Sequence, residues 1–200
     1  MKALFDFYKE KVKPLYAVIQ VDGYLPAEVL FEINAALDHV SRIFTCDQEE
    51  EEAISCAKRH LKRSCLDIFK LTVKTTHDQY DELNRMPGLV YLNNGEFSIQ
   101  MRKAWEEIRE AGIAARLQEG KNGYADTDDI PAFEKWEKVF ILCEEFRRTY
   151  YNHSGKDWAN KQAIWDKRKD YLIGGVVGAA ISLILSYLYS AVQSWLYAGV

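Results

Sequence analysis

Apolar residues recur at intervals of three and four through most of this chain, which predicts helices rather than strands. The pattern predicts helices over residues 3–21, 26–44, 47–84, 98–118 and 131–151, and a last helix from about 157 to the C-terminus. Pro14 lies inside the first of these, where we expect a kink or a break. The chain is therefore predicted to be all-α.

One stretch departs from the helical pattern. Pro87-Gly88 opens it and Asn93-Asn94-Gly95 closes it. An Asn-Gly pair favours the tight turn of a β-hairpin, so residues 89–92 and 97–99 are predicted to form a small hairpin across Asn94-Gly95.

The last thirty residues, Tyr171 to Val200, contain no Asp, Glu, Lys, Arg or His. At ~1.5 Å per helical residue they are about 45 Å long, which exceeds the ~30 Å hydrocarbon thickness of a bilayer. The alternative is a wholly buried core helix of a soluble protein, but so long a run without charge argues against it. We therefore expect a transmembrane helix that contacts the lipid bilayer.

Small residues recur at every fourth position of this helix. They are Gly174, Gly178, Ser182, Ser186, Ser190, Ser194 and Ala198. In lipid, small residues let helix backbones approach closely, and serine hydroxyls can bond across the contact. The stripe is predicted to be an oligomerisation face for a homo-oligomer. The serines could equally line a narrow wet path, and the sequence leaves both alternatives open.

Basic residues just before the span predict its orientation. They are Lys161, Lys167, Arg168 and Lys169, and no basic residue follows them. Because cytoplasmic flanks carry the excess of Lys and Arg, the N-terminal part is expected in the cytoplasm. The predicted organisation is a cytoplasmic helical bundle at 1–155, a basic juxtamembrane helix at 156–170 and a single-pass membrane helix at 171–200.

Composition narrows the chemistry. The net charge of -4 argues against a general affinity for nucleic acid. No phosphate-binding glycine loop, zinc-ligand spacing or serine nucleophile motif is present, so no cofactor or metal is expected. The loop with Asp126, Asp128 and Asp129 lacks the turn glycine and the closing Glu of a calcium-binding EF-hand, so Asp128 or Asp129 is expected to cap the helix that begins at Pro131. The cysteines are expected to be free, buried thiols: Cys46, Cys56, Cys65 and Cys143.

One short motif has an enzymatic interpretation. Arg148-Thr149-Tyr150-Tyr151-Asn152-His153 places an Arg and a His at the end of a predicted helix, with four residues between them. This RTYYNH resembles the signature of the HEPN superfamily of all-helical, commonly dimeric proteins, many of them metal-independent ribonucleases. The resemblance covers six residues and implies proton transfer by His153 and stabilisation of phosphate charge by Arg148. The alternative is that both residues cap or solvate a helix end.

Three functions follow as hypotheses. The first is a tail-anchored membrane effector, in which the helical part receives a protein or small-molecule signal and the assembled spans disturb or permeabilise the bilayer. Architecture of this kind would suit bacterial antiviral (anti-phage) defence, an inference from layout alone. The second is a membrane-tethered, HEPN-like ribonuclease, and the third is a non-enzymatic membrane scaffold.

Overall fold

A computed structural model describes residues 1–21, 26–45, 49–121 and 130–198, without the side chains of 130 and 191–198. Throughout these ranges the regular structure is helical and contains no strand, which confirms the all-α prediction. The chain divides into two compact units. Unit 1 comprises 1–85 and 99–153, and unit 2 comprises 86–98 and 154–200.

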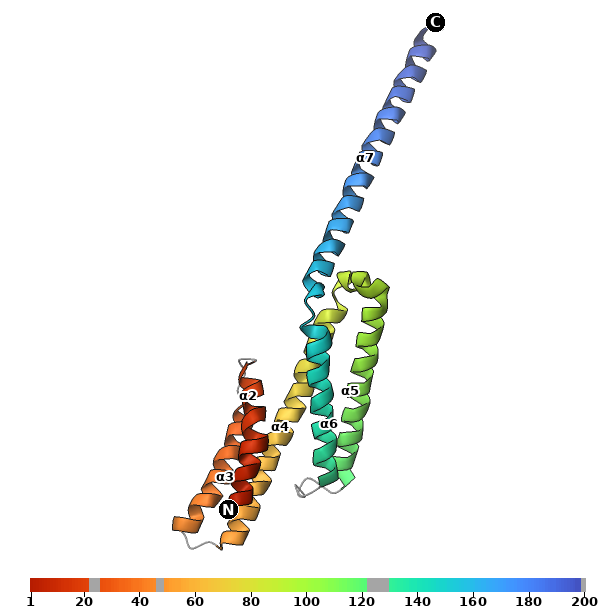
Figure 1. The fold of residues 1–200 in the computed structure, drawn as a ribbon. Coiled ribbons are helices and arrows are strands. Elements are labelled where there is room, and N and C mark those ends of the chain that lie inside the picture. Colours follow the sequence, from red (N-terminus) through yellow and green to blue (C-terminus); the bar gives the residue numbers. More distant parts are fainter. Residues whose placement is uncertain (22–25, 46–48, 122–129, 199–200) are drawn as a thin grey trace. The chain divides into compact units, whose positions relative to one another are not determined.

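The helices begin and end close to the predicted positions. They are α1 (Lys2–Phe7), η1 (Tyr8–Val12), α2 (Lys13–Val21), α3 (Ala27–Thr45), α4 (Glu50–Asn84), η2 (Pro87–Gly95), α5 (Glu96–Lys121), α6 (Ile130–Phe146), η3 (Arg147–Tyr151) and α7 (Gly155–Ala198). Figure 1 shows α7 as one uninterrupted helix from Gly155 to Ala198.

Pro14 does not break the first helix, because the chain widens into a π-helical turn immediately before it. The Lys13 N–H bonds to the Tyr8 carbonyl, five residues back. A proline cannot donate to the carbonyl four residues earlier and its ring crowds that carbonyl. The π-turn η1 relieves this conflict, so α1, η1 and α2 form one continuous helical segment from Lys2 to Val21.

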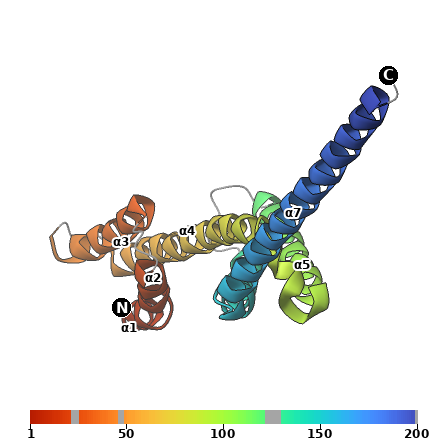
Figure 2. The same cartoon turned by 90° about the horizontal axis from the view of Figure 1, so that it is seen from above.

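The long helix α4 contacts several other helices of unit 1. α2 and α3 lie against its N-terminal part, as Figure 2 shows, and α6 packs along it further on. Phe69 of α4 is 1 % exposed and contacts the rings of Phe133 and Phe140 from α6, at centroid distances of 5.7 and 5.3 Å. A second cluster joins Ile19, Val29 and Ile68 of α2, α3 and α4. The core therefore follows one face of α4.

The buried face of α4 also includes polar residues. Ile68 and Phe69 are buried, but so are Thr72 and Thr76 further along. The hydroxyl of Thr72 donates to the Ile68 carbonyl at 2.9 Å, and that of Thr76 to the Thr72 carbonyl at 2.8 Å. Since each hydroxyl is satisfied within the helix, its methyl group can pack in the core at little cost.

The predicted hairpin is wrong. Residues 87–95 form the 3₁₀-helical segment η2, and residues 97–99 lie in α5. The turn signal itself was sound, since Asn93, Asn94 and Gly95 all have positive φ, at 48°, 53° and 89°. What decides against strands is packing within unit 2. Leu89 and Leu92, three residues apart, are buried as one face of η2, which packs against α7.

The cysteine prediction is confirmed for two of the four residues. Cys65 and Cys143 are buried free thiols, and burial raises their pKa to about 12 and about 11. Cys56 is free and half-buried. Cys46 and the aspartates Asp126, Asp128 and Asp129 lie outside the described residues.

Candidate functional site: the exposed helix α7

The apolar part of α7 has no cover within the chain. Between residues 171 and 190, nine Leu, Ile and Val side chains are each at least 51 % exposed. From 155 to 190 the helix is long and apolar enough to cross a membrane. No residue in its most hydrophobic stretch is buried by the rest of the chain. A core helix of a soluble protein is largely buried by its own chain. Every residue of α7 from Lys167 to Ser190 is exposed, so this part of the helix lacks such cover.

The small-residue stripe is exposed as far as it is described. Gly174, Gly178, Ser182, Ser186 and Ser190 are all solvent-accessible. A Cβ added at Gly174 or Gly178 would meet no atom within 4 Å, so the stripe leaves room for another backbone. The Ser190 hydroxyl donates to the Tyr187 carbonyl at 2.9 Å within its own helix. The side chains of Ser194 and Ala198 lie outside the described residues.

The stripe cannot lie along one straight line. Each step of four residues advances about 40° around a helix with 3.6 residues per turn. From Gly174 to Ser190 the small residues therefore turn through roughly 160°. A partner helix that crosses at a right-handed angle follows such a stripe better than a parallel one does. The role of these residues in self-association stays a prediction.

The start of α7 has two different faces. One packs against η2, where Gly88 lies so close to Ala159 that an added Cβ would be 2.2 Å from the Ala159 carbonyl oxygen. Ala159 is fully buried. On the same side, a hydrogen bond to the Asp166 carboxylate raises the pKa of the Tyr91 hydroxyl. η2 thus holds the first turns of α7 before the charge-free part begins.

The other face of these turns is aromatic and basic. Trp158 and Trp165 are 58 % and 65 % exposed, and the cations Lys161, Lys167, Arg168 and Lys169 are exposed as well. Positions 158, 161, 165 and 168 follow one another at intervals of three and four, so they share a face of the helix. Exposed tryptophans beside Lys and Arg are typical of membrane–water interfaces.

The RTYYNH motif lies on a second π-helical turn, η3. The Asn152 N–H bonds to the Arg147 carbonyl at 2.9 Å, five residues back. Arg148 is exposed and His153 is half-buried. The tyrosines between them have packing roles, because Tyr150 contacts the Phe146 ring at 5.2 Å and the Tyr151 hydroxyl donates to Glu82 at 2.9 Å. Catalysis by Arg148 and His153 stays a prediction.

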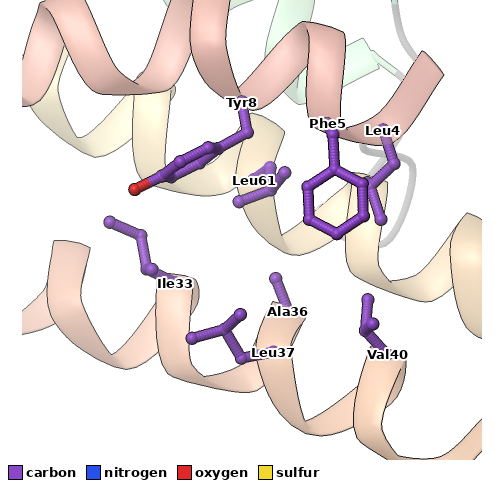
Figure 3. A pocket seen from close by; sticks show the side chains of 8 residues that line it. All are labelled: Leu4, Phe5, Tyr8, Ile33, Ala36, Leu37, Val40 and Leu61. Atoms are coloured by element: carbon purple, nitrogen blue, oxygen red, sulfur yellow. The ribbon is translucent and has the colours of Figure 1, made fainter. Parts of the chain in front are cut away.

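Unit 1 contains an apolar pocket of about 140 Å³ between α1 with η1, α3 and α4. Its lining side chains, shown in Figure 3, are Leu4, Phe5, Tyr8, Ile33, Ala36, Leu37, Val40 and Leu61. Sites for drug-sized ligands are usually ~300–1,000 Å³. The pocket is therefore large enough for one apolar side chain and too small for most metabolites.

Comparison with known proteins adds no relative. No protein-family model, curated protein or solved structure matches the chain.

Proposed function

We propose that this protein is a membrane effector anchored by α7, with its helical N-terminal part in the cytoplasm. A signal received by that part promotes association of the membrane helices, and the assembled helices disturb or permeabilise the bilayer. The basic residues from Lys161 to Lys169 support the orientation, because they precede the charge-free segment and none follows it.

The observation that carries the proposal is the uncovered surface of α7. Nine Leu, Ile and Val side chains are more than half exposed. If they stay in water, the chain lacks a stabilising free energy of burial on the order of 10 kcal/mol. A typical domain is stable by only ~5–15 kcal/mol in total. Something must cover this helix, and a bilayer fits it best. The helix is unbroken, so its backbone polar groups are bonded internally, as lipid requires.

Membrane disruption is tested by dye release from liposomes. The purified full chain should release an entrapped dye, and Gly178→Leu or Ser186→Leu should abolish release because each fills the stripe. The matched control is Gly175→Leu, which adds the same side chain one position off the stripe and should leave release intact. Release that is unaffected by both stripe variants would refute the effector hypothesis.

The copy number in detergent separates assembly from simple anchoring. A ring or larger assembly supports the effector, whereas a dimer favours the scaffold or the tethered ribonuclease. A scaffold should neither release dye nor cleave RNA and should still bind a partner.

A HEPN-like ribonuclease is the second candidate, and the π-turn η3 is the observation that favours it. π-Turns are rare and occur often at functional sites. If the enzyme hypothesis holds, His153→Ala should remove RNA cleavage and any cellular toxicity while the chain stays in the membrane. Toxicity that survives His153→Ala would exclude it.

A further inference from the structure

A second hollow of unit 1 has a different character from the apolar pocket. It is a groove of about 420 Å³ between α4, α5 and α6. Its lining residues are Lys70, Val73, Lys74, His77, Trp105, Ile108, Arg109, Gly112, Ile113, Arg116 and Trp136. This volume falls in the usual range for small-molecule sites, ~300–1,000 Å³.

Two helix faces build the walls of the groove. Lys70, Lys74 and His77 are spaced at four and three residues on α4, so they project from one face. Arg109 and Arg116, seven residues apart, project from one face of α5. The Trp105 ring of α5 closes one end against α4, with ring centroids 5.1 Å from His77 and 5.2 Å from Tyr80.

The charge of the groove is opposite to that of the chain. The chain has a net charge of -4, yet the lining contains four Lys and Arg residues and no Asp or Glu. Glu119, just outside the lining, accepts from Lys70 at 2.7 Å and from Arg116 at 3.0 Å. Burial works to raise the pKa of Glu119, but these bonds outweigh it and lower that pKa. Glu119 thus stays ionised and holds Lys70 and Arg116 in place.

Lys74 and Arg109 are the cations best placed for a ligand. Both are exposed. Arg109 is 4.0 Å from Glu106 on its own helix, an exposed pair of the kind that contributes little. Together with the two cations held by Glu119, they extend over about 10 Å of helix. A single phosphate cannot contact all four, whereas a chain of phosphates can.

The same groove has an aromatic and apolar component. Trp105 and Ile113 contribute apolar surface, and Trp136 is 6 % exposed with an indole N–H that has no hydrogen-bond acceptor among the described residues. A buried donor without an acceptor is costly, and a ligand or water oxygen in the groove could satisfy it. Cations beside aromatic rings suit a ligand with both phosphates and a flat ring.

Gly112 keeps the groove open. Glycine inside a helix costs about 0.5–1 kcal/mol relative to alanine, so its place in the middle of α5 calls for a reason. Gly112 lines the groove, and a Cβ there would meet no atom within 4 Å. The missing side chain therefore leaves space that any other residue would occupy.

From this combination we propose that the groove between α4, α5 and α6 binds a nucleoside triphosphate. The phosphates contact Lys74 and Arg109 together with Lys70 and Arg116, and the base lies along the side of Trp105 and Ile113. The site belongs to unit 1 alone, so its binding does not depend on the membrane activity proposed for α7.

The test is calorimetric titration of the full-length protein in detergent with ATP. Saturable binding is expected, weaker binding of inorganic tripolyphosphate, and none of adenosine. Gly112→Leu should weaken ATP binding at least about tenfold, because the new side chain fills the groove. Ala114→Leu, on an exposed position of the same helix, is the matched control and should bind ATP as the natural chain does.

The charge contribution has its own pair of variants. Arg109→Gln should weaken ATP binding about tenfold, since it removes one charge-assisted contact. Arg102→Gln changes an exposed arginine of α5 outside the groove and should have no effect.

Four results would overturn the proposal. They are the absence of ATP binding, unchanged binding by Gly112→Leu, equal binding of tripolyphosphate and ATP, and binding of a short single-stranded RNA in place of ATP. The third would show that the groove recognises only the anion, and the fourth would assign it to nucleic acid.

Discussion

The two longest helices, α4 and α7, are built for different surroundings. α4 has 35 residues, and eleven of them, from Ala53 to Leu83, are buried on one face, while its charged residues lie outside that buried set. α7 has 44 residues, yet between 155 and 190 only Ala159 is buried. An amphipathic helix finds its cover within its own chain, whereas a helix that is apolar on all sides needs cover from outside. Of the two helices, α7 is therefore the one that needs lipid or another molecule to cover its apolar side chains.

The largest test of this contrast places charge in the middle of α7. Ile181→Arg combined with Leu185→Arg should cost ~5–7 kcal/mol on insertion into a bilayer, because each central Arg costs ~2.5–3.5 kcal/mol. The variant should leave the membrane pellet on alkaline carbonate extraction, whereas the natural chain should stay. Tyr171→Arg with Leu172→Arg is the control, since arginines at the edge can reach the interface. Retention of the central variant would show that lipid does not surround α7.

A matched truncation compares the two helices directly. Ile68 of α4 is fully buried, while Ile184 of α7 is 59 % exposed. Ile68→Ala should lower the free energy of unfolding by ~2–5 kcal/mol through lost burial and a cavity. Ile184→Ala should change it by less than ~0.5 kcal/mol. Thermal unfolding of the full chain in detergent, followed by circular dichroism, measures both. Equal losses would mean that α7 is packed against protein.

The junction between covered and uncovered parts of α7 lies where η2 meets it. Gly88→Ala should cost about 1–3 kcal/mol or more, because the added Cβ would be 2.2 Å from the Ala159 carbonyl oxygen and backbone must shift. Gly175→Ala is the control, since its Cβ meets nothing within 4 Å. Limited proteolysis near 86–98 should accelerate in the first variant only. A stable, resistant Gly88→Ala would contradict the close packing of η2 on α7.

The helices could be predicted from the sequence because their periodicity is local. α3, α4 and α5 begin and end within three residues of the predicted positions. The structure of segment 86–96 could not be predicted in this way. Asn93-Asn94-Gly95 indicates positive φ angles, but it does not indicate whether strands or helices flank the turn. Gly88 in η2 lies against Ala159, far along the chain, and no local sequence pattern indicates that contact.

The groove between α4, α5 and α6 also could not be predicted from the sequence. Its cations come from α4 and α5, at positions such as Lys74 and Arg109 that look like ordinary solvated charges in sequence. The basic run from Lys58 to Arg63 is far more conspicuous and contributes nothing to the groove. The spacing of Trp105, Arg109, Gly112 and Arg116 was the available signal. It acquires meaning only once these helices are known to pair.

The smallest expected effect concerns pH and His39 of α3; residues 171–198 contain no Asp, Glu, Lys, Arg or His. His39 stacks on His60 with ring centroids 5.2 Å apart, and its Nδ1 is buried without a partner among the described residues. Burial first, then the charges of His60, Arg42 and Arg59, lower the pKa of His39 below 6.5, against the opposing carboxylate of Asp38. His60 itself bonds to Glu32 at 2.6 Å.

Because the pKa of His39 is lowered on folding, the unfolded chain binds the proton more readily than the folded protein. The resulting stability is fully present above pH 6.5 and is lost as the pH falls through the folded pKa. Between pH 7.5 and 5.5 the Tm should therefore fall by at most about 3 °C. His39→Gln should flatten this slope, while His77→Gln, at an exposed position of α4, should not. A slope that is unchanged in His39→Gln would place the pH dependence at another residue.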